Sequence, residues 1–416
     1  MKTSSLYLSA ILFVLLASQM QAQQRDLDNF RAPDKRGINT FEAPKDTLST
    51  FDGVEVRIGG ASTIQFQALD HENSGAVPLV TIGRNFNLPT ANLDLDVQLY
   101  DGVRMHLRTY LSSRHHNEPY VQGGYILIDK LDFISPGFMK NLMDMVTIKV
   151  GHMENNYGDA HFRRTDNAQA IYNPFVGNYI MDSFTTEVGA EVYYRNHGFI
   201  GMVGATNGKL NQSVTNPDAT GPSFLAKAGY DGLLSNNIRF RLTGSVYHTN
   251  KNANVSLYGG DRAGSRYYEV MELPDVHGFT SGRYNPRFGN EMTAFMINPF
   301  IKMGGLEFFG SFERASGKRT TEAQDRIFTQ LAGDLIYRFG ADENYYVAGR
   351  YNTVEGEESG NEIDIARYQL SAGWFMTKNI LAKVEYVNQE FNGFAPGTRF
   401  DEGKFKGLVL EAVISF

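Results

Sequence analysis

Apolar and polar residues alternate along most of the chain from Val54 onward, and this period of two constrains the fold more than any other feature. In residues 93–111, LDLDVQLYDGVRMHLRTYL, the apolar side chains before the turn share one face with each other, and Asp94, Asp96 and Gln98 share the opposite face. The pattern predicts roughly sixteen strands of about 10 to 14 residues, near the length that a tilted membrane strand needs. Their expected first residues are Val54, Ala91, Val103, Val121, Val146, Thr185, Phe199, Ser223, Ile238, Met292, Leu306, Arg326, Tyr345, Asp364, Ile380 and Phe405.

The register of the first clear hairpin follows from its two faces, because facing residues point to the same side of a sheet. Leu99 is expected to pair with Val103, with Tyr100-Asp101-Gly102 as a three-residue loop whose glycine takes the left-handed conformation. The polar face is then paired internally, as Asp94 with Arg108, Asp96 with His106 and Gln98 with Arg104.

The connections between strands indicate the architecture. Short turns such as YDG at 100–102 and MGG at 303–305 alternate with long loops at about 71–89, 156–183, 209–222, 251–289 and 392–403. A sheet crosses a bilayer only when it closes on itself, with its apolar face toward lipid. We therefore predict an all-β, transmembrane, antiparallel β-barrel of about sixteen strands, with short periplasmic turns and long extracellular loops, in the bacterial outer membrane. A soluble β-sandwich is the alternative, but it does not sort its loops by length.

The pattern of the first 52 residues predicts two further segments. Residues 1–22 combine Lys2, an apolar run and small residues, which is typical of a signal peptide; the apolar run is shorter than the roughly 20 residues of a spanning helix. Residues 23–52 carry mixed charges without any period, which predicts a flexible periplasmic arm, with a folded plug as the alternative. The barrel is expected to occupy residues 53–416.

Composition and motifs argue against several classes of function. The formal net charge of −7 gives no reason to expect nucleic acid as a partner, and the chain has no cysteine for a disulfide or a thiolate site. No nucleophile elbow, zinc-protease motif or P-loop is present, so we predict neither an enzyme nor a cofactor. His115, His116 and Glu118 could approach a metal, but an exposed loop pair is more often solvated, and we predict no metal site.

Charged residues on the polar face would line the lumen. The basic candidates are Arg104, Arg108, Lys149, Arg195, Lys227, Arg239, Arg241, Arg350, Arg367 and Lys383, and the acidic ones are Asp94, Asp96, Glu191, Glu307, Glu313, Asp334, Glu385 and Glu411. Four of the basic residues fall near mid-strand and could form a partial belt that sets ion preference, namely Arg108, Lys149, Lys227 and Arg350. The alternative, to which we give equal weight, is that these residues are solvated wall side chains that neutralise one another in ion pairs.

The loop at 156–183 is long for a barrel connection, and an inward fold would narrow the channel that roughly sixteen strands enclose. Arg163 and Arg164 would then lie near the constriction. An outward fold, as a surface loop, stays open as the alternative.

Two stretches resemble the phosphate-selective porin O and P family. VTIKVGHMENNYGDAHFRR is similar to a strand and loop of that family through Val150-Gly151 and Tyr157-Gly158, and EVGAEVYYRNHGFIGMVGATNG is similar to its next hairpin. The terminal Phe416 is also similar. The resemblance implies a homotrimeric channel in which loop and wall arginines attract anions, although acids interleave with the basic residues in this chain.

These patterns together predict a porin, which is a passive aqueous channel for small hydrophilic solutes, with a weak preference for phosphate-like anions. Its expected partners are outer-membrane lipid, small anions or other small solutes, and further copies of itself. A closed structural barrel in a secretion or adhesion complex, with its lumen filled by the arm, is the first alternative. An outer-membrane hydrolase is the second, and it would need a nucleophile and a base at the membrane rim.

Overall fold

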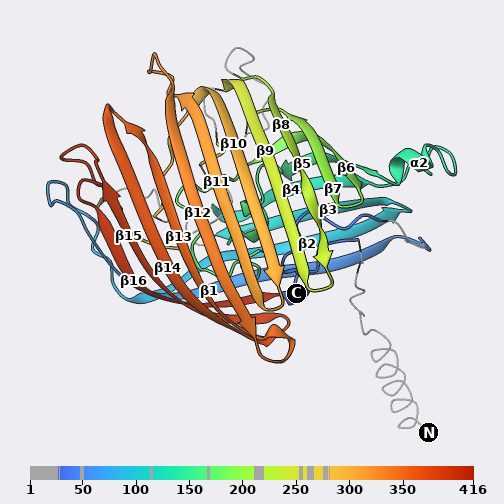
Figure 1. Ribbon diagram of the computed structural model, residues 1–416, viewed down its shortest axis with the longest axis horizontal. Coiled ribbons are helices and arrows are strands. Elements are labelled where there is room, and N and C mark those ends of the chain that lie inside the picture. Colours follow the sequence, from blue (N-terminus) through green and yellow to red (C-terminus); the bar gives the residue numbers. More distant parts are fainter. Residues whose placement is uncertain are drawn as a thin grey trace, which may run out of the picture.

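The fold is a closed barrel of sixteen antiparallel strands, seen in a computed structural model (Figure 1). The structure describes residues 27, 29–46, 51–112, 116–165, 169–209, 220–252, 256–259, 267–274, 280 and 282–416. The predicted signal peptide, residues 1–22, lies outside this part of the chain. The strands are β1 (Glu55–Glu72), β2 (Asn85–Tyr100), β3 (Val103–Ser112), β4 (His116–Ile128), β5 (Val146–Glu154), β6 (Thr186–Asn196), β7 (Phe199–Thr206), β8 (Ser223–Ser235), β9 (Ile238–Asn252), β10 (Gly289–Met303), β11 (Leu306–Lys318), β12 (Arg326–Phe339), β13 (Tyr345–Glu358), β14 (Asn361–Thr377), β15 (Ile380–Asn392) and β16 (Lys404–Ser415).

Each strand pairs with its neighbours in sequence, and β1 closes the barrel against β16. The C-terminal residue joins this seam, because Phe416 and Gly60 exchange backbone hydrogen bonds of 2.9 and 3.0 Å. Closure gives every strand two paired neighbours, which is the condition for a sheet inside a bilayer. The predicted barrel and its strand count are confirmed.

The predicted strand starts agree with the structure to within one residue except at four strands. β10 and β14 begin at Gly289 and Asn361, each three residues before the expected Met292 and Asp364. β2 begins at Asn85 and β4 at His116, each several residues before the first residue expected from the alternation. Both extensions contain proline or polar residues, in NFNLPT and HNEPY, which do not alternate. Pairing with a neighbouring strand extends these segments beyond what their own pattern indicates.

The β2–β3 hairpin shows one correct and one wrong prediction. Asp94 pairs with Arg108, Asp96 with His106 and Gln98 with Arg104, as expected. Val103 pairs with Tyr100 and not with Leu99, because the register shifts by one residue between Gln98 and Tyr100. The bulge at this point absorbs one residue of the expected loop, while Gly102 takes the left-handed conformation at φ 71°.

The described helical segments are short. They are η1 (Lys35–Gly37), α2 (Lys140–Met143), η2 (Ala160–Arg163) and η3 (Ala341–Glu343). α2 lies in the β4–β5 connection, which spans residues 129–145 and is longer than the other turns at that end of the barrel. Among the described residues, no helix is long and apolar enough to cross a membrane.

The outer surface of the barrel is apolar. On β12 the side chains of Leu331 and Leu335 are 53% and 56% exposed, while Gln330 and Asp334 on the opposite face are fully buried. Near the short turns, Tyr337, Phe339, Tyr345 and Trp374 form an exposed row of stacked aromatic rings with centroids 5.7–6.3 Å apart. An apolar band with an aromatic girdle is the surface of a membrane barrel. The chain is therefore an outer-membrane protein.

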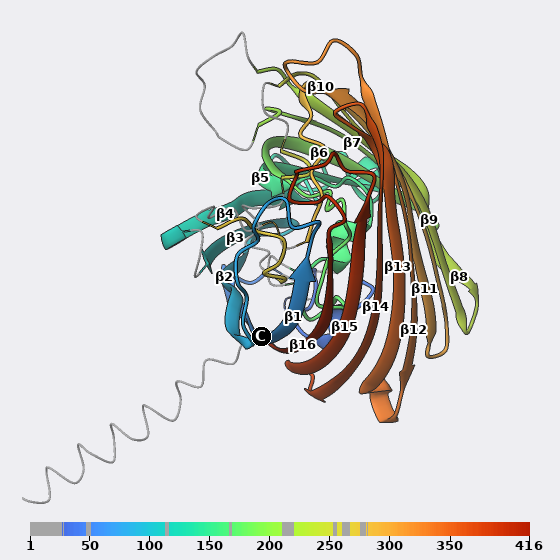
Figure 2. The same ribbon diagram turned by 90° about the vertical axis from the view of Figure 1, so that its left-hand side faces the viewer.

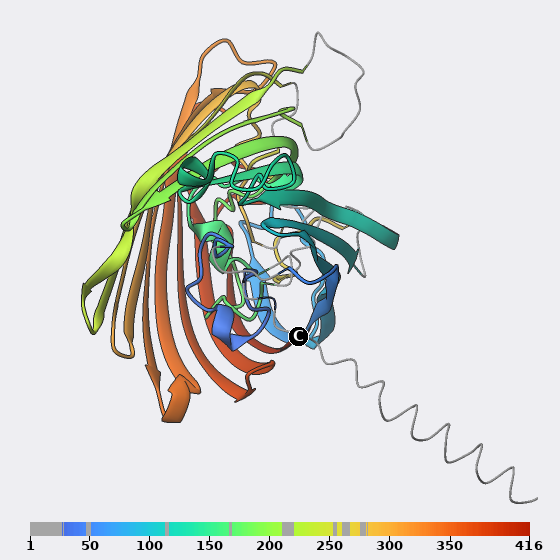
Figure 3. The same ribbon diagram turned by 90° about the vertical axis from the view of Figure 1, so that its right-hand side faces the viewer.

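The lumen holds chain segments as well as wall side chains. Figures 2 and 3 show that the N-terminal segment, drawn in blue, and the green loop after β5 lie in the space that the strands enclose. Apolar residues of this loop, including Val176, Ile180 and Met181, belong to a buried cluster with inward residues of the wall such as Tyr193 and Met202. The core of the molecule thus lies inside the barrel.

Candidate functional site

The described parts of the loop between β5 and β6, residues 155–165 and 169–185, fold into the lumen, which decides between the two alternatives left open by the sequence. Polar wall side chains bind its backbone: the amides of Val176, Ile180 and Met181 donate hydrogen bonds of 2.7–2.8 Å to side chains of the wall, which are Glu385, Asn352 and Gln330. The hydroxyl of Tyr157 in turn donates to Glu313, at 3.1 Å. The wall therefore supplies partners that buried backbone groups require.

Arg163 and Arg164 lie inside the barrel and are both buried. Arg163 donates to the Glu307 carboxylate at 2.6 Å and to Asn39 of the N-terminal segment at 3.0 Å. Arg164 makes two hydrogen bonds of 2.7 Å with Asp182, farther along its own loop. These pairs neutralise both guanidinium groups and fix the loop against the wall and against itself.

Lys227 and Arg350, two residues of the expected belt, also hold the loop. Arg350 binds Asp334 through two hydrogen bonds of 2.6 and 2.8 Å, and its guanidinium lies 4.1 Å from the ring centroid of Phe175. Lys227 lies 3.0 Å from the Asp159 carboxylate. Burial opposes ionisation of Asp159, but Lys227 and Arg241 outweigh burial and hold the pKa of this carboxyl well below its usual range.

Residues 29–46 of the N-terminal segment, here called the arm, occupy the short-turn end of the lumen. Its backbone carbonyls accept hydrogen bonds from wall arginines near the turns: Arg195 binds Ala43 at 2.7 Å, Arg239 binds Asn39 at 2.8 Å and Arg104 binds Pro44 at 2.9 Å. The structure thus places this part of the predicted arm where a folded plug would lie. The boundaries of the predicted arm, 23–52, and barrel, 53–416, stay a prediction.

Glu42 is the main charged contact of the arm. Its carboxylate accepts two hydrogen bonds of 2.9 Å from Arg241 on β9 and lies 3.7 Å from Lys227 on β8. Burial opposes ionisation, but Arg241 and Lys227 outweigh burial and lower the pKa of Glu42 to about 2. Glu42 is therefore ionised at neutral pH and fixes the arm to the wall.

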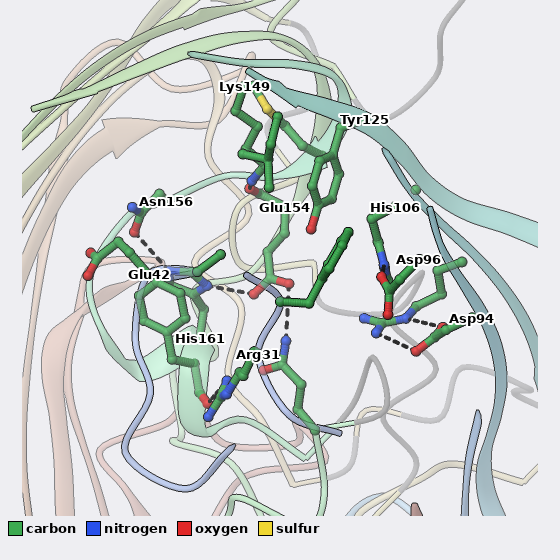
Figure 4. A pocket seen from close by; sticks show the side chains of 18 of the residues that line it. Arg31, Glu42, Asp94, Asp96, His106, Tyr125, Lys149, Glu154, Asn156 and His161 are labelled. Atoms are coloured by element: carbon green, nitrogen blue, oxygen red, sulfur yellow. Dashed lines mark hydrogen bonds and ion pairs between the residues drawn. The ribbon is translucent and has the colours of Figure 1, made fainter. Parts of the chain in front are cut away.

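A cavity of ≈ 190 Å³ lies between the arm, the inward loop and the wall formed by β1 to β6 (Figure 4). Two of the six predicted selectivity residues, Arg108 and Lys149, line this cavity. Arg108 makes two hydrogen bonds of 2.7 Å with Asp94, and Lys149 lies 3.5 Å from Glu191. Arg163, Arg164 and Arg350 line a separate space of only ≈ 20 Å³.

Charges of both signs line the cavity beside β1 to β6. Its basic residues are Arg31, Arg57, Arg108, Lys149 and Arg195, and its acidic residues are Glu42, Asp94, Asp96 and Glu154. Most of them are paired: Asp96 binds His106 at 2.6 Å and Arg57 at 2.5 Å, and Glu154 binds His161 at 2.6 Å, as Figure 4 shows for His161. Charged groups of both signs thus lie among the apolar and aromatic residues of the lining, with one basic residue in excess.

Several of these lining residues were not singled out from the sequence. Arg57 follows the same alternation as the other wall residues, because it is buried and its neighbours Val56 and Ile58 are exposed. The alternation of the sequence could therefore have identified it as an inward residue. Arg31 and Glu42 lie in a segment without any period, which carried no signal. His115 lies outside the described residues, as do the side chains of His116 and Glu118.

Comparison with known proteins shows the fold. No protein-family model matches the chain, and no curated protein matches it by sequence. Solved structures similar to it include the anion-selective porin from Comamonas acidovorans, at 10% identity and a TM-score of 0.56, covering 88% of this chain and 100% of that one. The outer membrane channel DcaP of Acinetobacter baumannii is similar at 13% identity and a TM-score of 0.54, covering 89% and 99%. OmpT, an outer membrane protein of Vibrio cholerae in a trimer form, is similar at 9% identity and a TM-score of 0.54, covering 88% and 100%.

These structures share the barrel of porins and channels with this chain. At such low identity the likeness concerns the fold alone, and the sequence comparison assigns no porin subtype.

Proposed function

We propose that this protein is an outer-membrane porin, a passive channel for small hydrophilic solutes. The observation that carries the proposal is the cavity beside β1 to β6, a part of the lumen that is lined by charged residues and that neither the arm nor the inward loop fills. A sixteen-strand barrel has room for a water-filled path, and charged side chains keep such a path wetted. A porin needs no nucleophile, and we assign no catalytic role to any residue.

The proposed selectivity is weak and favours anions. Arg108 and Lys149 are the two predicted selectivity residues that face the cavity, and acidic neighbours offset most of their charge. Arg163, Arg164, Lys227 and Arg350 are proposed to act mainly by holding the loop that bounds the path. The resemblance to phosphate-selective porins and the fold shared with an anion-selective porin support an anion preference.

We also propose a homotrimer in outer-membrane lipid, made from a precursor whose residues 1–22 are removed. The resemblance to trimeric porins and the fold shared with an outer membrane protein in a trimer form support the oligomer. The exposed apolar band supports the contact with lipid.

A closed structural barrel is the second candidate, because the arm and the loop together fill much of the lumen. The wall arginines bind the arm by its carbonyls, and such contacts could close the barrel permanently. The two candidates differ in one property: a porin passes solutes with the arm present.

A liposome swelling assay tests the proposal. Vesicles that contain the purified, full-length barrel are diluted into isotonic arabinose or into a trisaccharide such as raffinose. We expect swelling in arabinose and much slower swelling in raffinose, because the cavity is narrow. Absence of swelling in either sugar, with correctly folded protein in the vesicles, would support the closed barrel and contradict the porin.

A further inference from the structure

A second cavity, of ≈ 400 Å³, lies among the long loops at the opposite end of the barrel from the arm. We call this space the loop cup. It is lined by parts of four connections, those after β9, β11, β13 and β15, and by residues next to them. The lining residues used below are Arg283, Tyr284, Arg287, Arg319, Glu358, Phe394, Arg399 and Phe400. Its volume lies in the range of small-molecule sites.

Positive charge dominates the loop cup. Arg319 lies 2.5 Å from Glu358, and Arg399 lies 3.3 Å from Glu272. Including adjacent charges, six arginines face four carboxylates: Arg164, Arg283, Arg287, Arg319, Arg326 and Arg399 against Asp182, Glu272, Glu322 and Glu358. The ion pairs among these groups leave two positive charges in excess.

Arg287 is the arginine that these carboxylates do not neutralise. Its side chain is exposed and lines the loop cup, and within the described part of the chain no carboxylate lies within ion-pair distance of it. Its backbone has a left-handed φ of 57°, and its amide donates to Asn285 at 2.8 Å. A non-glycine residue in this conformation is uncommon and is favoured where the surrounding structure fixes it.

The rest of the lining is aromatic. The ring of Phe400 stacks on Phe391 at 4.6 Å, packs against Phe394 at 5.2 Å and has the guanidinium of Arg399 4.5 Å from its centroid. Tyr284 packs against Phe394 at 5.9 Å and donates from its hydroxyl to Glu358 at 2.7 Å, which fixes its ring. These contacts fix the aromatic rings that line the same cavity as Arg287.

We propose that the loop cup binds solutes that join an anionic group to an aromatic ring, as an aromatic carboxylate does. Arg287 binds the anionic group, and the accessible edges of the Phe394 and Phe400 rings contact the aromatic body. Anions without an apolar body gain only the charge contact, and neutral aromatic molecules gain only the packing. The proposal names a solute class for the proposed channel and rests on that function, although binding itself needs no conduction.

Isothermal titration of the full-length barrel in detergent at pH 7 tests the proposal, with benzoate, inorganic phosphate and benzyl alcohol as probes. We expect benzoate to bind more tightly than either of the others. Arg287→Gln should weaken benzoate binding roughly tenfold or more, the loss expected for one charge-assisted hydrogen bond. Because Arg287 is exposed, this variant should fold as the parent does.

Lys140→Gln is the matched control, because it removes the same charge from an exposed site at the other end of the barrel. Equal benzoate affinity in Arg287→Gln and the parent, or phosphate binding as tight as benzoate binding, would overturn the proposal. So would the same loss in Lys140→Gln as in Arg287→Gln. Vesicle swelling measured on the same preparation distinguishes the binding site from the channel. Benzoate binding without swelling would contradict the channel and support the binding site. Swelling without benzoate binding would support the channel and contradict the binding site.

Discussion

Glu42→Gln should weaken the attachment of the arm to the wall. In the parent, the Glu42 carboxylate accepts two hydrogen bonds of 2.9 Å from Arg241 and lies near Lys227. A pKa lowered from 4.5 to about 2 corresponds to roughly 3 kcal/mol of stabilisation at neutral pH, at about 1.4 kcal/mol per pH unit. Losing it should raise the population of the detached arm roughly a hundredfold.

The pH dependence of this clamp has a definite sign. The pKa of Glu42 is lower in the folded barrel than in the unfolded chain, so the stabilisation is complete above about pH 4.5 and disappears as the pH falls toward about 2. The parent should therefore release its arm more readily between these values. The Glu42→Gln variant should lack this part of the pH dependence.

Cysteine labelling measures arm release directly, because the chain has no cysteine of its own. Ala43→Cys places one thiol on the arm, and its reaction rate with a charged maleimide reports exposure to water. We expect much faster labelling with Glu42→Gln added than without it, and no change with the control Glu362→Gln, an exposed residue at the loop end. Equal labelling rates in all three proteins would refute the clamp.

Three further predictions follow from the wall and the seam. Asp94→Asn neutralises a carboxylate of the cavity, so it should leave Arg108 unpaired and shift the reversal potential toward anion preference. Arg108→Gln should shift the reversal potential toward cation preference. Salt-gradient recordings in which both variants shift the potential in the same direction would contradict the pairing. Arg163→Ala with Arg164→Ala should shift the reversal potential less than Arg108→Gln, since both arginines are paired away from the cavity beside β1 to β6; a larger shift would place the loop arginines in the path. Deleting Phe416 removes its two backbone hydrogen bonds to Gly60 at the seam and should reduce membrane insertion; unchanged amounts of heat-modifiable barrel would count against this.

The lipid face permits an energetic test as well. Leu370→Lys, on β14 near mid-strand, should destabilise the barrel by about 2 to 4 kcal/mol in lipid, while Glu362→Lys, on the same face at the loop end of the strand, should cost about 0 to 1 kcal/mol. Urea unfolding in vesicles measures both, and equal costs would show that Leu370 does not face lipid at mid-membrane.

Most of the barrel could be predicted because each strand carries its own signal. Inward and outward residues alternate strictly in segments such as β12 and β13, so both the strand and the face of Asp334 or Arg350 follow from the local sequence. Segments without alternation carried no such signal, and the early starts of β2 and β4 depend on partners in neighbouring strands. The predicted pairing of Leu99 with Val103 is wrong for a related reason, because a one-residue bulge leaves the alternation on either side unchanged.

The contents of the lumen could not be predicted in the same way. Arg163 and Arg164 were placed near the constriction, but their partners Glu307 and Asp182 are set by the path of the loop, which has no period. The arm shows the difficulty most clearly. Besides the Glu42 carboxylate, three wall arginines hold it by its backbone carbonyls, and a carbonyl is present at every residue and marks none of them.

Single-channel recording in a planar bilayer tests the central claim most directly. Full-length barrel should give stepwise conductance with a reversal potential that weakly favours anions in a salt gradient, and the preference should decrease in 1 M salt, where the screening length is about 3 Å. Removing residues 29–46 should raise the conductance of each step, because the arm fills the short-turn end of the lumen. A full-length barrel that stays silent, and conducts only once the arm is removed, would contradict the porin and identify a closed barrel.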